Sequence, residues 1–303
     1  MEIHPLSKFW SLIYSILSEF WALSMSKVED AAIQNDVPIE LYLYSELGLE
    51  YFSTEDFRRR DPFSNPEIFE RQFARLDVKG WIEPLPGGKY RVTEKARHAV
   101  RQIIQAGDAQ FADFALMSAE DMERLVVLLK RIARENELAP EPPQKWAIFK
   151  RFRTAHAQSP WILQAREYLM DLFAYRDDSH LTAARPHFGE GGIVWLVLGS
   201  LWNGQALTAQ RMAEIMENRG YDVEEFEVAL QAAVELGWAE SSEAPQEFRL
   251  TLKGKELWEE VEKLTNEYFF RPWSVLTPSE LEELYNLLIK LRDGLQTFRK
   301  QIT

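Results

Sequence analysis

Residues 65–81 read NPEIFERQFARLDVKGW, and the fold of the chain is decided here. The apolar residues of this stretch recur at the spacing of one face of an α-helix, namely Ile68, Phe69, Phe73 and Leu76. A Gly-Trp pair ends the helical run, and the turn-forming sequence PLPGG at 84–88 leads into a short strand, KYRV, at 89–92. Thr93 is then placed as the N-cap of a further helix. The stretch predicts a helix, a hairpin and a second helix, in that order.

The same succession returns in the second half of the chain. Residues 222–238 read DVEEFEVALQAAVELGW, a polar turn covers 241–246, and Phe248–Leu250 and Thr251 repeat the strand and the helix start. This succession is typical of a winged helix-turn-helix: a helix that ends at a Gly-Trp pair, a small β-hairpin or wing, and a helix that begins at a threonine. The sequence therefore predicts a mainly α fold with small β wings, built from two tandem winged helix-turn-helix domains.

Apolar helices flank each winged unit. The first half is expected to begin with helices over Ser7–Met25 and Val37–Tyr51, and Ser53 is placed to cap the next one. Long helices starting after Ser118 and Thr277 carry leucines three and four residues apart. Such a seam needs a partner helix. We therefore expect these helices either to pack the two halves together or to pair two chains.

A segment rich in proline and glutamate separates the two units. Residues 135–144 read ENELAPEPPQ, a composition typical of a linker. Leu172-Phe173-Ala174 echoes Phe20-Trp21-Ala22, so the duplication extends to the first helix. We expect an N-terminal lobe at 1–138 and a C-terminal lobe at 139–303, which together form a pseudo-dimer within one polypeptide.

Composition narrows the classes of function. The 303 residues contain no Cys, which excludes disulfides, thiolate nucleophiles and cysteine metal sites and fits a reducing cytoplasm. No secretory signal pattern is present, and the most apolar run, Gly192–Trp202, is too short to cross a bilayer. A net charge of −13 argues against a protein that coats nucleic acid, but it permits a local basic footprint. We expect a cytoplasmic protein without a membrane partner.

These features resemble the MarR-type winged-helix transcription regulators. The likeness rests on the Gly-Trp exit, on wings ending in Arg91-Val92-Thr93 and Arg249-Leu250-Thr251, and on the leucine-rich helices after Ser118 and Thr277. It implies helices that dimerise, wings that flank DNA, and a small-molecule site between these parts. The chain departs from the family by carrying two units. It is therefore expected to act as a pseudo-dimeric monomer or as a homodimer, and the usual two-half-site DNA geometry is an open question.

Charge differs between the two predicted winged units. Residues 53–97 hold ten basic and eight acidic side chains, a net charge of +2, whereas 207–255 hold five basic and ten acidic ones, a net charge of −5. The second recognition helix, 222–238, contains five acids and no base and would repel phosphates. Contact with double-stranded DNA is therefore assigned to the first lobe, through Arg58, Arg59, Arg60, Arg71, Arg75, Lys89 and Arg91. The alternative is that these charges only solvate the surface and balance nearby acids.

Three further groups of residues have more than one interpretation. The basic aromatic segment 145–153 is either a DNA-binding arm or, more commonly, an amphipathic helix between the lobes. Asp-Asp-Ser-His at 177–180 with His187 has metal-ligand residue types without a ligand spacing, so capping roles are favoured and no metal is predicted. One aromatic set either lines a pocket for a flat effector or fills the core: Trp10, Tyr14, Trp21, Trp161, Tyr168, Trp195 and Trp202.

Signatures of catalysis are missing from the sequence. It has no phosphate-binding Gly loop, no nucleophile elbow and no His-Glu-x-x-His, so neither an enzyme activity nor a cofactor is predicted. The sequence favours a transcription regulator whose first lobe binds DNA and whose second lobe serves assembly or the sensing of a small aromatic effector. The other interpretation is a ligand-sensing or protein-interaction scaffold that kept winged-helix lobes and does not bind DNA.

Overall fold

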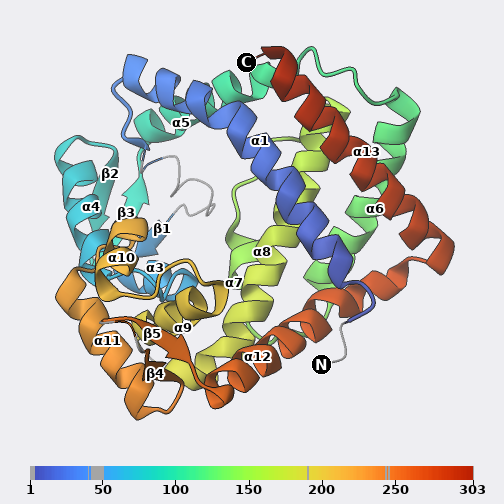
Figure 1. Ribbon diagram of the computed structural model, residues 1–303. Helices are drawn as coiled ribbons and strands as arrows, with labels where there is room; N and C mark the ends of the chain where they lie inside the picture. The colour runs from blue at the N-terminus through green and yellow to red at the C-terminus, as the bar shows by residue number, and fades with distance from the viewer. Residues whose placement is uncertain are drawn as a thin grey trace.

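The computed structural model describes residues 4–39, 41, 51–189, 191–242, 244 and 246–302, and it is mainly helical (Figure 1). The helices of the first half are α1 (Ser7–Gln34), α3 (Thr54–Arg60), α4 (Pro66–Val78), α5 (Glu94–Asp108), η1 (Ala109–Phe111) and α6 (Ala119–Leu138). The linker predicted at 135–144 begins later than expected, because α6 continues to Leu138; residues 139–144 then lead to the short helix α7 (Trp146–Lys150). The second half contains α8 (Trp161–Phe188), α9 (Ile193–Asn203), α10 (Ala209–Ile215), η2 (Glu217–Arg219), α11 (Val223–Glu235), α12 (Leu252–Phe270), η3 (Arg271–Val275) and α13 (Pro278–Ile302).

Two small antiparallel sheets accompany the helices. In the first half the strands lie in the order β1-β3-β2, and their bounds are β1 (Tyr51–Ser53), β2 (Ile82–Leu85) and β3 (Lys89–Val92). In the second half β4 (Ala239–Ser241) pairs with β5 (Phe248–Leu250). Both predicted hairpins are confirmed. The helix expected over 37–51 falls mostly outside the described residues, and its last residue, Tyr51, lies in β1 opposite Arg91.

Side-chain caps explain where several helices begin. Ser53 and Asp56 form a reciprocal capping box at the start of α3. The Ser118 hydroxyl caps α6, and Thr277 and Glu280 exchange bonds of 2.9 and 3.2 Å at the start of α13. Each cap supplies an acceptor for an N–H group that the first turn of a helix leaves unpaired. The predicted caps are therefore confirmed.

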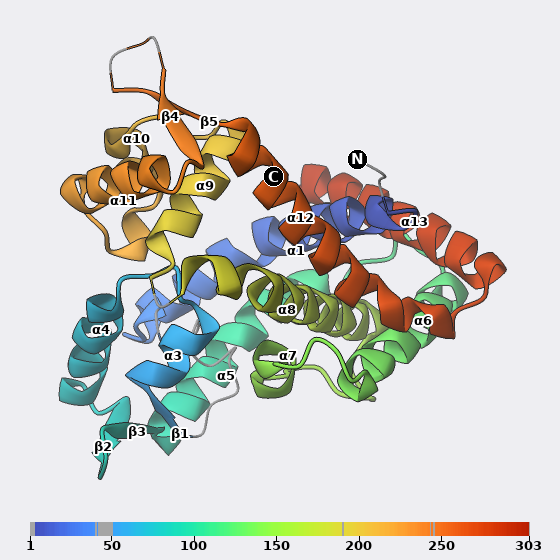
Figure 2. The same ribbon diagram turned by 90° about the horizontal axis from the view of Figure 1, so that it is seen from below.

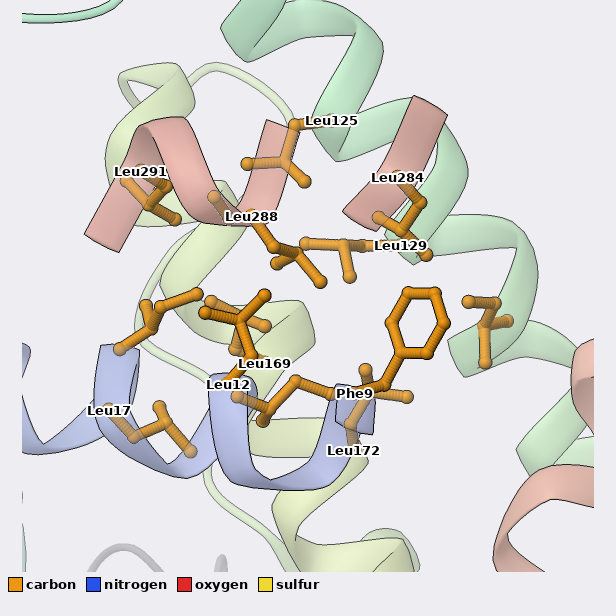
Figure 3. Close-up of a cluster of buried hydrophobic side chains, with 14 of the residues drawn as sticks. Phe9, Leu12, Leu17, Leu125, Leu129, Leu169, Leu172, Leu284, Leu288 and Leu291 are labelled. Carbon is orange, nitrogen blue, oxygen red and sulfur yellow. The ribbon is translucent and has the colours of Figure 1, made fainter. Parts of the chain in front are cut away.

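The largest hydrophobic core takes side chains from both halves of the chain. Figure 3 shows Leu12 of α1 and Leu169 of α8 meeting Leu125 of α6 and Leu288 of α13. Helix α1 packs against α13, and α6 packs against α8, so the first helix of each half lies on the last helix of the other. Of the two outcomes expected for the leucine-rich helices, the structure shows packing of the two halves within one chain.

Each half also has a smaller core beneath its own wing. In the first, Phe73 of α4 packs on Phe52 and Phe57 with ring centroids 5.0 and 5.2 Å apart. In the second, Phe226 of α11 is buried in a cluster that also holds Trp195. These clusters fix α4 and α11 relative to their sheets.

The bonds that join each wing to the helix after it recur in both halves. Thr93 Oγ1 donates to the carbonyl of Gly80 at 3.1 Å, and Thr251 Oγ1 donates to the carbonyl of Gly237 at 2.6 Å. The lysine two places after each threonine donates to a carbonyl at the end of the preceding helix, at 3.0 and 2.7 Å. Gly80 and Gly237 have φ of 68° and 72°, a conformation that favours glycine at a helix C-terminus. The repeated residues therefore make the same local bonds.

The two wings point away from each other. In Figure 2 the β4–β5 hairpin and the β2–β3 hairpin lie at opposite ends of one side of the molecule, with α11 and α4 between them. The helices of the shared core lie on the other side of the same view. Within the described ranges, no helix is both long enough and apolar enough to cross a membrane.

Candidate nucleic-acid interface

Helix α4 presents two arginines to solvent, beside the exposed Glu67 and Glu70. Asn65 caps the helix by accepting the N–H of Glu67 at 3.1 Å, and Phe73 and its neighbours bury the opposite side in the first-lobe core. Arg71 and Arg75 are exposed and lie one turn apart. Arg71 pairs with Glu67 at 3.4 Å, an exposed contact of the kind that contributes little to stability. Both guanidinium groups are accessible to a phosphate backbone or to base edges.

Strand β3 adds two more cations. Lys89 and Arg91 are exposed, whereas the alternate residues Tyr90 and Val92 pack against the first-lobe core. Tyr90 contacts Phe73 with ring centroids 5.3 Å apart, and this contact sets the face that the strand turns to solvent. Arg91 forms an ion pair with a carboxylate on the neighbouring strand β2. The two cations therefore lie on the solvent side of the β2–β3 hairpin.

The three arginines at the end of α3 lie apart from this face. In both views α3 lies between α4 and α8 (Figures 1 and 2). Arg60 bonds Asp177 of α8 at 2.6 Å in a partly buried ion pair. Arg58 and Arg59 line a cleft that also includes residues near the C-terminus of α8. Four of the seven predicted DNA contacts therefore lie on α4 and β3. The other three, Arg58, Arg59 and Arg60, lie at the end of α3 beside the second half of the chain.

Helix α11, the counterpart of α4, has an acidic outer face. Asp222 and Glu225 are used in a capping box at its start, while Glu224, Glu227 and Glu235 are exposed. On the second wing the exposed Arg249 is paired with a carboxylate of the facing strand at 2.9 Å, as Arg91 is in the first. The prediction that the second recognition helix would repel phosphates is consistent with this surface.

The segments that precede α4 and α11 contact each other directly. Arg219 of η2 bonds both carboxylate oxygens of Asp61, at 2.8 and 2.7 Å. Asn65, the cap of α4, donates its N–H to the Arg219 carbonyl at 2.8 Å and its side-chain amide to Glu225 of α11 at 3.2 Å. Gly220 lies against Ile68, leaving 3.2 Å between an added Cβ and that side chain. We call these bonds the turn–turn contact.

The turn–turn contact limits how both lobes can approach a duplex. In helix-turn-helix proteins the N-terminal part of the recognition helix reads the major groove, and half-sites lie about 34 Å apart. Here the N-termini of α4 and α11 are joined by a hydrogen bond between Asn65 and Glu225. In this conformation the two helix N-termini cannot enter successive major grooves. The sequence did not reveal this contact, because Asp61 and Arg219 belong to no local pattern.

The basic segment at 145–153 is partly buried: Lys150 and Arg153 are exposed, whereas Lys145 and Arg151 are held by neighbouring helices. Lys145 donates to the carbonyls of Asn136 and Glu137 at 3.1 and 2.7 Å and so caps the C-terminus of α6. Arg151 is almost fully buried against α8, where it bonds Glu167 at 2.6 Å and a second carboxylate at 2.9 Å. Trp146–Lys150 forms the expected inter-lobe helix, although its basic residues do not all face outward. Arg151 is therefore not accessible as part of a DNA-binding arm.

The acidic and histidine residues on α8 have structural partners. Asp178 accepts the N–H groups of Ala147 and Ile148 at 2.7 and 3.0 Å and caps α7, as the favoured interpretation predicted. His180 lies 3.3 Å from Glu262 and accepts the indole N–H of Trp195 at 3.3 Å. Among the described residues, no three side chains of metal-ligand type gather into a site.

The predicted aromatic set divides between the cores and an open cleft. Trp10 and Trp202, together with Trp258, line a cleft of about 960 Å³ between α1, α8, α9 and α12. The guanidinium of Arg176 lies 4.6 Å from the Trp10 ring centroid and bonds Glu262 at 2.8 Å. The rest of the set lies elsewhere: Trp21 and Tyr168 pack on the shared core, Trp195 is buried in the second-lobe core, and Tyr14 and Trp161 are exposed.

A related space in the first half is nearly closed. The residues between α1, α5 and α8 enclose only about 50 Å³, and Phe152 and Thr154 of the connecting segment line this space. The bond between Arg166 and Thr154 at 3.2 Å holds that segment in place. The two halves therefore differ in having one open inter-helix cleft and one nearly closed cleft.

Comparison with known proteins supports a helix-turn-helix. Residues 154–297 match a family described as a helix-turn-helix family. The match runs from just before α8 into α13 and so includes α10, η2 and α11. The second half of the chain thus carries a helix-turn-helix domain. No curated protein and no solved structure matches the chain.

Proposed function

We propose that the chain is a DNA-binding transcription regulator made of two MarR-like winged helix-turn-helix lobes, joined in the region 139–144. The helix-turn-helix match over residues 154–297 supports the class of protein. The repeated bonds at Thr93 and Thr251 support two copies of one unit. The first lobe contacts double-stranded DNA, and the second serves assembly and effector binding.

The carrying observation is the difference in charge between α4 and α11. The exposed face of α4 balances Arg71 and Arg75 against Glu67 and Glu70, whereas α11 exposes glutamates and contains no basic residue. The family match lies in the half with the acidic helix, so surface charge rather than the match assigns DNA contact to the first lobe. Because the turn–turn contact joins the two lobes, we propose a footprint set by α4 and the β2–β3 wing alone.

The open cleft supports an effector site. Its volume, about 960 Å³, lies within the range of small-molecule sites, and Trp10, Trp202 and Trp258 offer flat apolar walls. The cleft borders the shared core through α1 and the second winged unit through α9 and α12. A bound aromatic molecule would therefore touch both the assembly helices and the second lobe.

Binding of random duplex DNA over a salt series tests the proposed function. If Arg71, Arg75, Lys89 and Arg91 each neutralise one phosphate, the logarithm of the binding constant should fall against the logarithm of salt with a slope of about −4. Arg71→Ala/Arg75→Ala should weaken binding and reduce the slope by about 2. The matched control, Arg211→Ala/Arg249→Ala, removes two exposed arginines from the second lobe and should leave binding unchanged.

The non-DNA-binding scaffold predicts a different result. A folded wild-type protein that shows no duplex binding at low salt would favour a ligand-sensing or protein-interaction role. Equal losses of DNA binding in the two double variants would show that the first lobe is not the preferred surface.

A further inference from the structure

A second cleft, distinct from the aromatic one, lies between the C-terminus of α3, the start of α7 and the C-terminus of α8. Its volume is about 710 Å³, a size typical of small-molecule sites. The charged and aromatic residues that line it are Glu55, Arg58, Arg59, Lys145, Trp146 and Arg185. Four cations therefore face one carboxylate. We call this the basic cleft.

Two of the cations have structural partners. Arg58 lies 3.9 Å from Glu55, one turn back on α3, and Lys145 is held by the carbonyls at the end of α6. The exposed Arg58–Glu55 pair is a weak interaction, so it balances the charge of Arg58 only in part. The acceptors of Lys145 are neutral carbonyls, which leave its charge unbalanced. These two residues form the rim of a site rather than its centre.

The centre of the basic cleft is formed by Arg59 and Arg185. The Arg185 guanidinium donates to the backbone carbonyl of Arg59 at 2.9 Å, and the side chains of both arginines line the same cleft. Burial, followed by the charge of Arg59, lowers the pKa of Arg185, and the charge of Glu55 only partly opposes this effect. Within the described part of the chain, neither guanidinium forms an ion pair with a carboxylate. Cations near helix C-termini interact favourably with the helix dipole, but that effect does not require two of them side by side.

We propose that the basic cleft binds a small phosphorylated ligand, with a phosphate group held between Arg59 and Arg185. Guanidinium groups bind phosphate oxygens through paired, charge-assisted hydrogen bonds, and a shared anion would relieve the repulsion between these two. Trp146 on the wall offers an apolar surface to the rest of the ligand. The ligand would bridge α3 of the first lobe and α8 of the second.

The position of the basic cleft favours a small ligand over DNA. Arg59 of α3 and Arg185 of α8 meet between these two helices, whereas Arg71 and Arg75 belong to α4. In Figures 1 and 2, α3 lies between α4 and α8. A concave site formed by three helix ends fits a phosphorylated small molecule better than the side of a duplex. The proposal is therefore independent of DNA binding by the first lobe.

Titration of the full chain with pyrophosphate by calorimetry tests the proposal. Pyrophosphate should bind the wild type, and Arg59→Gln/Arg185→Gln should weaken that binding by about tenfold or more. Arg211→Gln/Arg249→Gln, which removes two exposed arginines elsewhere, should bind like the wild type. Arg59→Gln alone is a milder variant, because the bond from Arg185 ends on the backbone carbonyl and survives the change.

Duplex DNA in the same set of variants separates the two sites. Arg59→Gln/Arg185→Gln should keep the DNA affinity of the wild type, and Arg71→Ala/Arg75→Ala should keep its pyrophosphate affinity. Equal pyrophosphate binding by all variants, or none by the wild type, would overturn the proposal. So would a cleft variant that loses duplex binding while keeping its affinity for pyrophosphate.

Discussion

Asp178 shows how one buried side chain organises the junction between the lobes. It is 2% exposed and accepts two N–H groups at the start of α7, at 2.7 and 3.0 Å. Burial outweighs these bonds and the nearby Arg60, and it raises the pKa of Asp178 to about 6. The carboxylate therefore fixes α7 against α8 while its ionised form is disfavoured by the lack of solvent.

The raised pKa predicts how Asp178→Asn changes the pH dependence of stability. The folded chain binds this proton more tightly than the unfolded chain, so the contribution of Asp178 is most favourable below pH 4 and is lost as the pH rises through 6. Between pH 4 and pH 7, the free energy of unfolding of Asp178→Asn should rise relative to that of the wild type by up to about 3 kcal/mol, as measured by urea unfolding. The exposed Asp113→Asn should show no such shift. A constant difference between wild type and Asp178→Asn across this range would contradict the prediction.

Arg151 shows that a basic residue in a charged segment can be buried. It lies in the basic string at 145–153, yet it is buried between Glu167 and Asp171. The identity of a residue does not say whether its charge faces water or a carboxylate from another helix. Only the packing of the connecting segment against α8 decides this.

At the scale of the elements, the two Thr-capped helices differ at one position. Gly254 of α12 lies so close to the wing that an added Cβ would overlap the carbonyl oxygen of Trp238. The same position after the first cap is Ala96 of α5, which carries a Cβ and is buried. The approach of helix to wing is therefore closer in the second lobe.

Gly254→Ala is expected to destabilise the second winged unit. The methyl group meets a backbone oxygen that cannot rotate away, so the N-terminus of α12 must shift from β4 at a cost of about 1–3 kcal/mol. Chemical denaturation followed by circular dichroism measures the change. The control is Lys255→Ala, an exposed change in the same turn that should stay within about 0.5 kcal/mol. An unchanged midpoint for Gly254→Ala would show that the contact relaxes freely.

On the scale of the whole molecule, the shared core and the turn–turn contact act together. The shared core takes side chains from α1 and α6 on one side of the linker and from α8 and α13 on the other. The turn–turn contact adds the Asp61–Arg219 pair at the far end of α8. The shared core fixes α1, α6, α8 and α13 against one another. We expect the turn–turn contact to set the distance between α4 and α11.

This expectation is tested by distance measurements between spin labels. The chain has no Cys, and Val78 and Val228 are 88% and 66% exposed on α4 and α11, so both accept a label after mutation to Cys. The wild type should give one narrow distance distribution. Arg219→Ala should give a longer and broader one, because the turns lose the bonds to Asp61.

The control for this measurement is Arg211→Ala. Arg211 forms an exposed pair with Glu214 on α10 and makes no bond to the first lobe among the described residues, so its loss should not move the labels. An unaltered distribution in Arg219→Ala would assign the spacing of the lobes to the shared core alone.

The sequence by itself determined the elements and their order. The caps at Ser53, Ser118 and Thr277, the Gly-Trp exits and the leucine seams were all predicted and are all present, because each depends on residues within a few positions of one another. The same local signals located both hairpins. Of the helix expected over 37–51, positions 39 and 41 are helical and Tyr51 lies in a strand paired with the distant β3, while the remaining positions lie largely outside the described residues.

Only the tertiary structure decided which surfaces stay free. In the folded chain Arg60 pairs with Asp177, and Arg151 is buried against α8. The space between α1, α5 and α8 is nearly closed, whereas the cleft between α1, α8, α9 and α12 is open. The tertiary structure also joined the caps of α4 and α11, which no spacing along the chain indicates. The physical reason is that charge pairing and packing depend on which side chains meet across the fold. Periodicity records only which face of an element is buried.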